Sequence, residues 1–451
     1  MSHPPEASSR ALALADYMRG PLALMPGIVL LLIIQAYSRL GQWPPSQVLA
    51  LSLGMTSSMV ITSGFVQAVS RRGSVYLALG DPGAASRFLR ISITVAGACV
   101  VAIAAMLFFV ATGLGLFALA DRLIFGLAFV GLAAIWLIAA GLSLVQATGW
   151  LGLGLAAGLI SGLITDRAVV LISGAHLVAA TIVGFAVALA LMLSAMNRRL
   201  NVKSNGQPSR TVLPPAAYLV YEAAPYFVYG SLYMVFILLP HVLGWLGAAG
   251  MNQERMSAVA SLEAGLTLSL PPVVLAGGVA EHALRLFWLR AREAQAAVPG
   301  NDLRRFGRTL SELYDRQLQS YLAVSSVCGL AILVVFHVAL GTGSLQQWLQ
   351  VRDLATLVFV FHASLIAYFL VGWGLFNCMF CVTLARPGLA LRAVLIAMAV
   401  MVITGIPLSM GINLGYAAVA FIFGAAAFVV ASRRATSLVL ESADYYYFSS
   451  F

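Results

Sequence analysis

A run of 43 residues without a charged side chain extends from Leu123 to Thr165. As a single helix it would be about 65 Å long, roughly twice the hydrocarbon thickness of a bilayer. We therefore expect two membrane spans that turn back at the short polar segment 146–149. A second uncharged run, residues 393–432, predicts another hairpin with its turn at 411–413.

The composition of the whole chain points to lipid as its solvent. Of the 451 residues, 61% are hydrophobic and only 9% are charged, whereas about a quarter of the residues of a soluble domain are charged. No soluble fold of this length could bury so much apolar surface. Membrane lipid is therefore the expected surrounding of most of the chain.

The apolar segments predict an all-α integral membrane protein of about twelve transmembrane helices. They lie near residues 20–38, 47–69, 91–111, 123–145, 148–165, 168–196, 216–240, 257–280, 320–341, 354–384, 388–410 and 413–432. A polar linker, residues 197–215, divides them into lobes of six spans each, residues 20–196 and 216–432. Residues 1–19 and 433–451 are the expected cytoplasmic ends.

The placement of the basic residues supports this topology. With the amino terminus in the cytoplasm, the inner segments hold 21 of the 26 basic residues. The outer loops hold the other five, one in each: Arg39, Arg122, Arg167, Arg255 and Arg352. Basic residues concentrate on the cytoplasmic side of membrane proteins, so both ends are predicted to lie inside. The net charge of +10 then reflects topology, and no nucleic-acid partner is expected.

The seventh predicted span carries the most informative polar face. Tyr218, Glu222, Tyr226, Tyr229 and Tyr233 follow one another at intervals of four, four, three and four residues, so they share one side of a helix. Phenols beside a carboxylate are costly against lipid and suit a wet substrate path, where aromatic rings could let sugars slide. The alternative is a set of tyrosines at the level of the inner headgroups.

Four further polar residues, Glu263, Thr267, Gln35 and Gln67, join the candidate substrate path. Glu263 shares a helix face with Thr267 and Pro271, and a carboxylate inside a membrane suggests a functional site. Either Glu222 or Glu263 could bind a proton or a cationic substrate, or could be a helix-end carboxylate that reaches headgroups or a nearby arginine. Gln35 and Gln67 are uncharged, and such residues often join neighbouring helices instead.

The longest predicted cytoplasmic piece, residues 281–319, contains an amphipathic basic helix. Its apolar stripe recurs at helical spacing: Leu303, Phe306, Leu310, Tyr314 and Leu318. Arg304, Arg305 and Arg308 lie around this stripe. Two interpretations stay open, a helix lying on anionic lipid and a docking surface for a cytoplasmic partner.

The sequence favours a transporter over an enzyme, and we predict no catalytic residue, cofactor or metal. The Cys378-x-x-Cys381 pair has no second pair or histidine cluster to complete a metal site. No Walker loop is present, so ATP hydrolysis by this chain is not expected. A lipid-dependent glycosyltransferase would need larger outer loops with catalytic carboxylates. A scaffold that conducts nothing but holds a synthase is a third possibility.

Four stretches resemble the PelG family, the inner-membrane transporter of Pel exopolysaccharide machinery. The seventh-helix motif is Pro225–Tyr233, with the sequence PYFVYGSLY, and the second-helix motif is Thr62–Gln67, with the sequence TSGFVQ. Leu270–Pro272 and the tyrosine-rich tail 443–451 agree as well. The chain departs from the family at Pro240-His241, where an Asp-Arg pair is expected.

The resemblance implies a MATE-like fold, with two six-helix lobes around a central cavity. It implies export of a partly de-N-acetylated, cationic amino-sugar polymer across the bacterial inner membrane during biofilm formation. It also implies partners, namely a cytoplasmic glycosyltransferase and other Pel-type inner-membrane subunits. The alternatives are a lipid-linked oligosaccharide flippase and a MATE-type ion-coupled exporter of small molecules.

Overall fold

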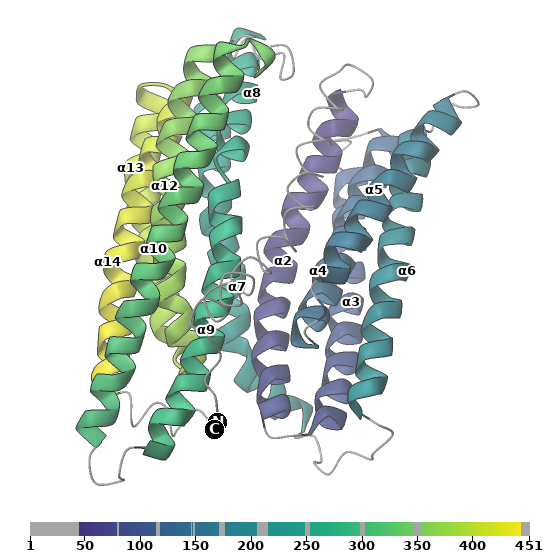
Figure 1. The fold of residues 1–451 in the computed structure, drawn as a ribbon. Coiled ribbons are helices and arrows are strands. Elements are labelled where there is room, and N and C mark those ends of the chain that lie inside the picture. Colours follow the sequence, from purple (N-terminus) through teal and green to yellow (C-terminus); the bar gives the residue numbers. More distant parts are fainter. Residues whose placement is uncertain are drawn as a thin grey trace. The chain divides into compact units, whose positions relative to one another are not determined.

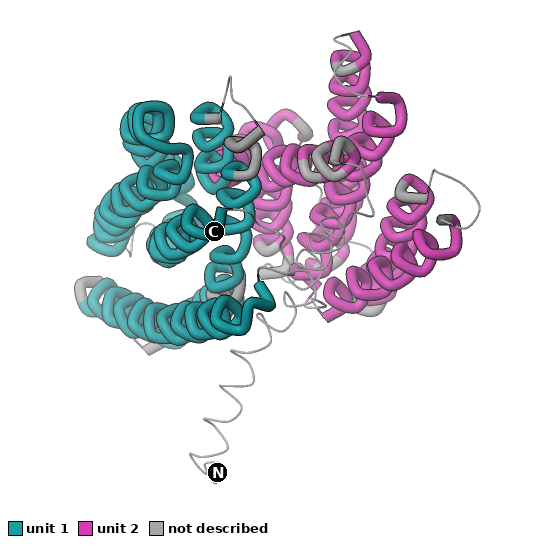
Figure 2. The backbone as a smooth tube through the Cα atoms, turned by 90° about the horizontal axis from the view of Figure 1, so that it is seen from above, with its two compact units in different colours: residues 1–24, 236–451 teal, residues 25–235 magenta. Residues whose placement is uncertain are grey.

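The computed structural model of the chain consists of long helices (Figure 1). It describes residues 45–78, 81–113, 118–145, 147, 149–170, 176–204, 215–248, 253–297, 303–345 and 353–442. Every regular element in these ranges is helical, which confirms the all-α prediction for this part of the chain. The chain forms two compact units, shown in different colours in Figure 2.

Unit 2 comprises residues 25–235. Its described helices are α2 (Pro45–Ala78), α3 (Pro82–Gly113), α4 (Leu119–Leu144), α5 (Gly149–Val170), α6 (His176–Ser204) and the first part of α7 (Ala216–Ala248). Within this unit, α4 packs along α2 and α6, and α5 pairs with α6.

Unit 1 comprises residues 1–24 and 236–451, so the boundary between the units falls inside α7. Its described helices are the rest of α7, α8 (Gln253–Leu268), α9 (Pro271–Ala297), α10 (Leu303–Gly341), α12 (Leu354–Thr383), α13 (Pro387–Gly411), the 3₁₀ turn η2 (Leu414–Tyr416) and α14 (Ala417–Glu441). Here α14 packs along α12 and α13, and α9 packs along α10.

Local chemistry explains where several helices begin. Proline is the first residue of α2, α3, α9 and α13. A backbone N–H at this position would have no acceptor within the helix, so proline costs the helix no hydrogen bond there. Asp81 caps α3 by accepting from the Ala84 backbone N–H at 2.8 Å. Asp353 caps α12 by accepting from the Thr356 N–H at 3.0 Å. These two carboxylates therefore have a structural role as helix caps.

Ten segments of the described chain are long and apolar enough to cross a membrane. They coincide with ten of the twelve predicted spans. Of the other two, residues 47–69 lie in α2, which is not among the ten, and residues 20–38 lie outside the described residues. The total of twelve spans and the orientation of the ends stay predictions.

Both predicted hairpin turns are confirmed. Helix α4 ends at Leu144 and α5 begins at Gly149, and α13 ends at Gly411 before η2 begins at Leu414.

The predicted span 257–280 is not one helix, because α8 ends at Leu268 and α9 begins at Pro271. Pro271 and Pro272 have no N–H to continue the ladder of α8. The Ser269 hydroxyl lies 2.9 Å from two backbone carbonyl oxygens of the last turn of α8, those of residues 265 and 266. The Ser269 hydroxyl thus adds side-chain hydrogen bonding to the carbonyl end of α8.

The apolar stripe of segment 281–319 faces the protein interior, and the interpretation as a lipid-lying surface is wrong. The stripe belongs to α10, which continues without interruption to Gly341. Phe306, Leu310 and Tyr314 are buried, and the Tyr314 ring packs edge-on against Phe380 of α12 at 4.9 Å. The stripe is apolar because it packs against other helices of unit 1.

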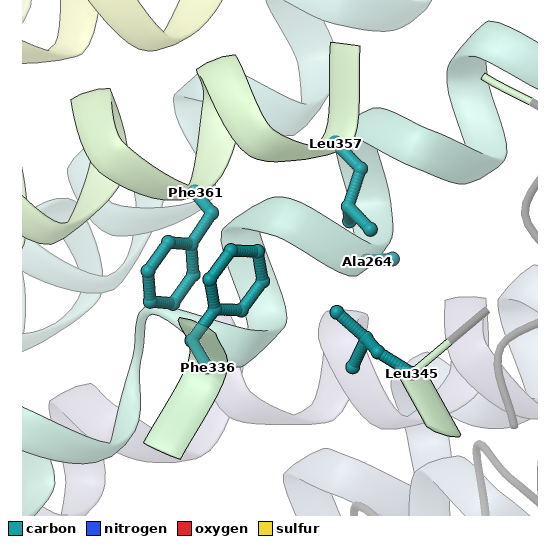
Figure 3. Packing of buried hydrophobic residues seen from close by; sticks show 5 residues of the cluster. All are labelled: Ala264, Phe336, Leu345, Leu357 and Phe361. Atoms are coloured by element: carbon teal, nitrogen blue, oxygen red, sulfur yellow. The ribbon is translucent and has the colours of Figure 1, made fainter. Parts of the chain in front are cut away.

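Another contact between α10 and α12 lies near the end of α10 (Figure 3). The rings of Phe336 and Phe361 stack with centroids 3.7 Å apart and planes 7° apart. Ala264, Leu345 and Leu357 complete this buried cluster. The stacked rings set the register of the two helices at this level.

Candidate functional site

The second-helix motif and the seventh-helix motif pack against each other in unit 2. The Ser63 hydroxyl donates to the Gly230 carbonyl at 3.0 Å. A Cβ atom added to Gly64 would lie 2.6 Å from the Phe227 carbonyl and 2.5 Å from the Ser231 hydroxyl. One added to Gly230 would lie 2.6 Å from the Ser63 carbonyl. Glycine at both positions therefore allows α2 and α7 to approach at backbone distance.

The predicted tyrosine face of α7 changes character along the helix. Tyr218 is exposed, whereas Tyr226 and Tyr229 are buried, and Tyr229 is only 3% exposed. The Tyr229 and Tyr233 rings stack with centroids 6.3 Å apart and planes 22° apart. The exposed start of the face fits the headgroup-level interpretation, and the buried middle does not.

Arg72 of α2 neutralises Glu222 of α7. The two side chains form an ion pair, in which Glu222 is 37% exposed. The Arg72 guanidinium also lies 5.9 Å from the centroid of the Tyr218 ring, within the range of a cation–π contact. Glu222 is therefore a paired carboxylate, which matches the predicted alternative of a carboxylate that reaches an arginine. Hydropathy and periodicity do not identify which arginine is the partner.

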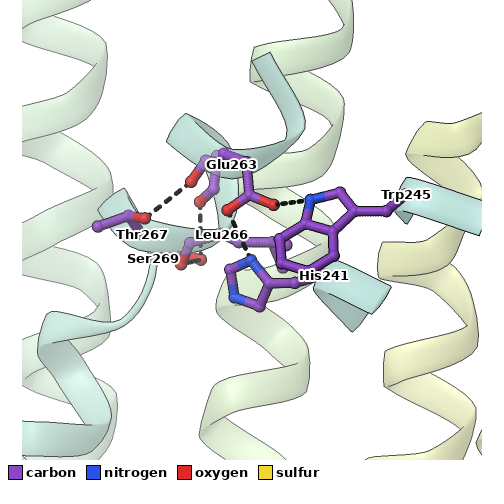
Figure 4. A network of polar contacts seen from close by, with 7 residues as sticks. His241, Trp245, Glu263, Leu266, Thr267 and Ser269 are labelled. Carbon is purple, nitrogen blue, oxygen red and sulfur yellow. Dashed lines mark hydrogen bonds and ion pairs between the residues drawn. The ribbon is translucent and has the colours of Figure 1, made fainter. Parts of the chain in front are cut away.

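Glu263 of α8 is the centre of a polar cluster in unit 1 (Figure 4). His241 Nδ1 lies 2.7 Å from one carboxylate oxygen, and the Trp245 indole N–H donates to the other at 2.8 Å. The Thr267 hydroxyl donates to the Glu263 backbone carbonyl at 2.8 Å. The Glu263 side chain remains 28% exposed. Glu263 and Thr267 thus occur together as predicted, and α7 supplies two residues that were not predicted.

This cluster joins a carboxylate and an imidazole from two different helices. When Glu263 is ionised and His241 is neutral, the carboxylate accepts from the imidazole N–H and the pair carries one negative charge. His241 lies in the candidate span Ala217–Gly247 and Glu263 in Ala258–Leu284, and ionisable groups at such places are candidates for proton relays.

His241 and Trp245 did have one weak sequence signal, since they lie four residues apart and therefore on one face of α7. Their relation to Glu263 depends on how α7 packs on α8, which periodicity cannot supply. The break between α8 and α9 follows shortly after Glu263, and Ser269 at the break is fully buried. Irregular backbone at membrane depth is tolerated where protein covers it.

The remaining predicted site residues are scattered. Gln67 faces Gly230, because a Cβ atom on that glycine would lie 2.8 Å from Gln67 Cγ. Gln35 and the side chain of Arg304 lie outside the described residues, while Arg305 and Arg308 are exposed on α10.

Metal-binding side chains do not gather in groups of three or more in the part of the chain that the structure describes. No group of three or more His, Cys, Asp or Glu side chains there could hold a metal ion. The two cysteines of the C-x-x-C pair are both buried in α12.

No protein-family model and no curated protein matches this sequence. Among solved structures, the MATE transporter VcmN of Vibrio cholerae in its bent form is 14% identical, with a TM-score of 0.70 over 97% of this chain and 99% of that one. A MOP superfamily transporter of Pyrococcus furiosus is 14% identical, with a TM-score of 0.67 over 95% of this chain and 96% of that one. A multidrug resistance MATE transporter in an outward-facing conformation has the same TM-score at 13% identity, over 95% of this chain and 96% of that one.

At this level of identity the comparisons establish the fold. Together with the ten apolar segments, they lead to one conclusion. The chain is a multi-pass membrane protein with the fold of MATE transporters of the MOP superfamily.

Proposed function

We propose that this protein is a transporter that exports an amino-sugar-containing, Pel-like exopolysaccharide across the bacterial inner membrane. The observation that carries the proposal is the contact between the second-helix and seventh-helix motifs. These are the stretches on which the resemblance to the PelG family rests, and they meet through Ser63, Gly64 and Gly230. Motifs that are far apart in the sequence but share one contact are consistent with a common role.

The chemistry of the polar residues fits a cationic sugar polymer. Glu263 offers a carboxylate within an apolar segment, which would attract the amines of a partly de-N-acetylated chain. The ring of Tyr233, which is partly exposed and stacks on the buried Tyr229, provides an aromatic surface of the kind on which sugars and cations are commonly held.

The exposed basic residues of α10 give the proposal a place for a partner. The apolar stripe of α10 packs against the other helices of unit 1. Arg305 and Arg308 lie on the opposite, exposed side of α10. We propose that they, together with Arg304, dock a cytoplasmic glycosyltransferase or another Pel-type subunit through its acidic surface.

Secretion of the polymer by a deletion strain complemented with variants tests the proposed function. The deletion should abolish secretion, and wild-type protein should restore it. Glu263→Gln removes the charge but keeps the shape, and we expect it to lower secretion about tenfold or more at equal expression. The matched control is Glu293→Gln, since Glu293 is exposed on α9 and bonded to Arg290; it should secrete normally.

The same strains distinguish the alternatives. Normal secretion in the deletion strain would refute polysaccharide export. Loss of dye efflux in that strain, measured with a cationic fluorescent dye, would favour a MATE-type exporter of small molecules. Accumulation of a lipid-linked oligosaccharide on the cytoplasmic leaflet would favour a flippase. Wild-type secretion by Glu263→Gln would remove this carboxylate from the mechanism.

A further inference from the structure

Two histidines outside the cluster of Glu263 face each other across α10 and α12. The dipeptide Phe-His occurs in both helices, as Phe336-His337 and as Phe361-His362. Because the two phenylalanine rings stack (Figure 3), the histidines that follow them are brought together. Their Nε2 atoms lie 3.1 Å apart. The packed aromatic pair thus holds two imidazoles in place before any ligand arrives.

The hydrogen bonds of His362 determine which of its nitrogen atoms carries a proton. Its Nδ1 atom lies 2.7 Å from the Val358 carbonyl oxygen, and a carbonyl only accepts. Nδ1 therefore carries the hydrogen, and Nε2 of neutral His362 presents its lone pair to His337. A ring N–H donated to a backbone carbonyl is the usual way in which proteins orient a metal-binding histidine.

We propose that His337 and His362 bind a divalent transition-metal ion, with Zn²⁺ as the reference ion. Two imidazole nitrogens bound to one tetrahedral Zn²⁺ at about 2.0–2.1 Å would be roughly 3.3 Å apart. The observed 3.1 Å requires only a small separation of the rings. His337 would carry its proton on Nδ1, which leaves both Nε2 lone pairs for the ion.

Water would complete the coordination shell. His337 is exposed and lies four residues before the end of α10 at Gly341, about 6 Å along the helix axis. This depth is close to the interface, where water is available. The predicted topology places this end of α10 at the outer surface, so the ion would come from the periplasm. Bound there, it would clamp α10 to α12, independently of the transported substrate.

Zinc titration of the full-length protein in lipid nanodiscs tests this site. The protein would carry an affinity tag without histidine, and His3→Gln in all samples would remove the terminal histidine as a competing ligand. We expect one Zn²⁺ per chain and a rise in the unfolding midpoint of about 2–4 °C, which Mg²⁺ does not produce.

Two variants separate metal binding from the structural role of the pair. His337→Gln keeps a side-chain N–H that can donate to His362 but removes one imidazole. Its midpoint without zinc should stay near that of the parent, and its zinc response should disappear. His362→Ala should also lose the response. An absent response in the parent protein, or a response of either variant as large as that of the parent, would overturn the proposal.

Discussion

Two carboxylates in the described apolar segments are paired in different ways. Glu222 is paired with Arg72, and a guanidinium stays charged at every pH that the protein experiences. Glu263 is paired with His241, and an imidazole has no permanent charge. This difference makes the first pair a fixed connection between α2 and α7. The carboxylate of the second pair has no permanently charged partner.

Exchanging the charges of the first pair tests its fixed role. Arg72→Glu and Glu222→Arg should each lower the unfolding midpoint, because each places like charges together. The double exchange should recover most of the loss. The coupling free energy should be about 1 kcal/mol or less, since Glu222 is 37% exposed and water screens the pair. Thermal unfolding in detergent of the four proteins measures it.

Transport by the same four proteins separates the two roles considered for Glu222. If its charge serves only the ion pair, the double exchange should secrete polymer as the wild type does. A double variant that is as stable as the wild type but inactive would show that a carboxylate on α7 itself is required.

Close packing defines the contact between α2 and α7. Gly64 and Gly230 each face backbone or side-chain atoms of the other helix at less than the distance that a Cβ atom needs. Interfaces of this kind gain van der Waals contact from the absence of side chains. Changes in size should therefore matter more here than changes in polarity.

Alanine substitutions of glycines test this contact. The expected change in the free energy of unfolding has one sign inside the contact and the opposite sign outside it. Gly64→Ala and Gly230→Ala should each destabilise the protein by about 1–3 kcal/mol through overpacking. The matched control is Gly97→Ala in α3, where an added Cβ atom meets nothing within 4 Å. Alanine there should be neutral or stabilising by up to about 1 kcal/mol, because it favours the helix. Midpoints that fall equally in all three variants would contradict the close-packing argument.

The helix ends that the sequence predicted well are those that follow from the length of an uncharged run and from the polar residues within it. The turns near Gly149 and Ile412 followed from uncharged runs too long for one span. The break before Pro271 was missed, because average hydropathy does not register a missing N–H. The amphipathic stripe was recognised, but amphipathicity alone does not say whether protein or lipid covers the apolar side.

The partners within the candidate site could not be predicted. Glu263 was selected because a carboxylate in an apolar segment is costly wherever it lies. Its bonds to His241 and Trp245, like the pair of Arg72 and Glu222, join different helices. Such pairs depend on helix packing and have no periodicity within one element.

The topology of the whole molecule has one decisive segment, Ala258–Leu284, which contains the break between α8 and α9. If the two helices together cross the membrane once, the chain enters and leaves this segment on opposite sides. If the break made them a re-entrant pair, both ends would lie on the same side, and every later loop would be reversed. The predicted distribution of basic residues, 21 inside and five outside, depends on the single crossing.

Reporter fusions on either side of this segment decide between the two topologies. A reporter that is active only in the periplasm should be active when fused at Gly250 and inactive when fused at Gly300. A reporter that fluoresces only in the cytoplasm should give the reverse pattern, which controls for expression. The positive charges near Gly300, including Arg292 and Arg304, should hold that end inside. Equal activity of the periplasmic reporter at both positions would mean that α8 and α9 do not cross together, and the arrangement of all later helices would have to be reversed.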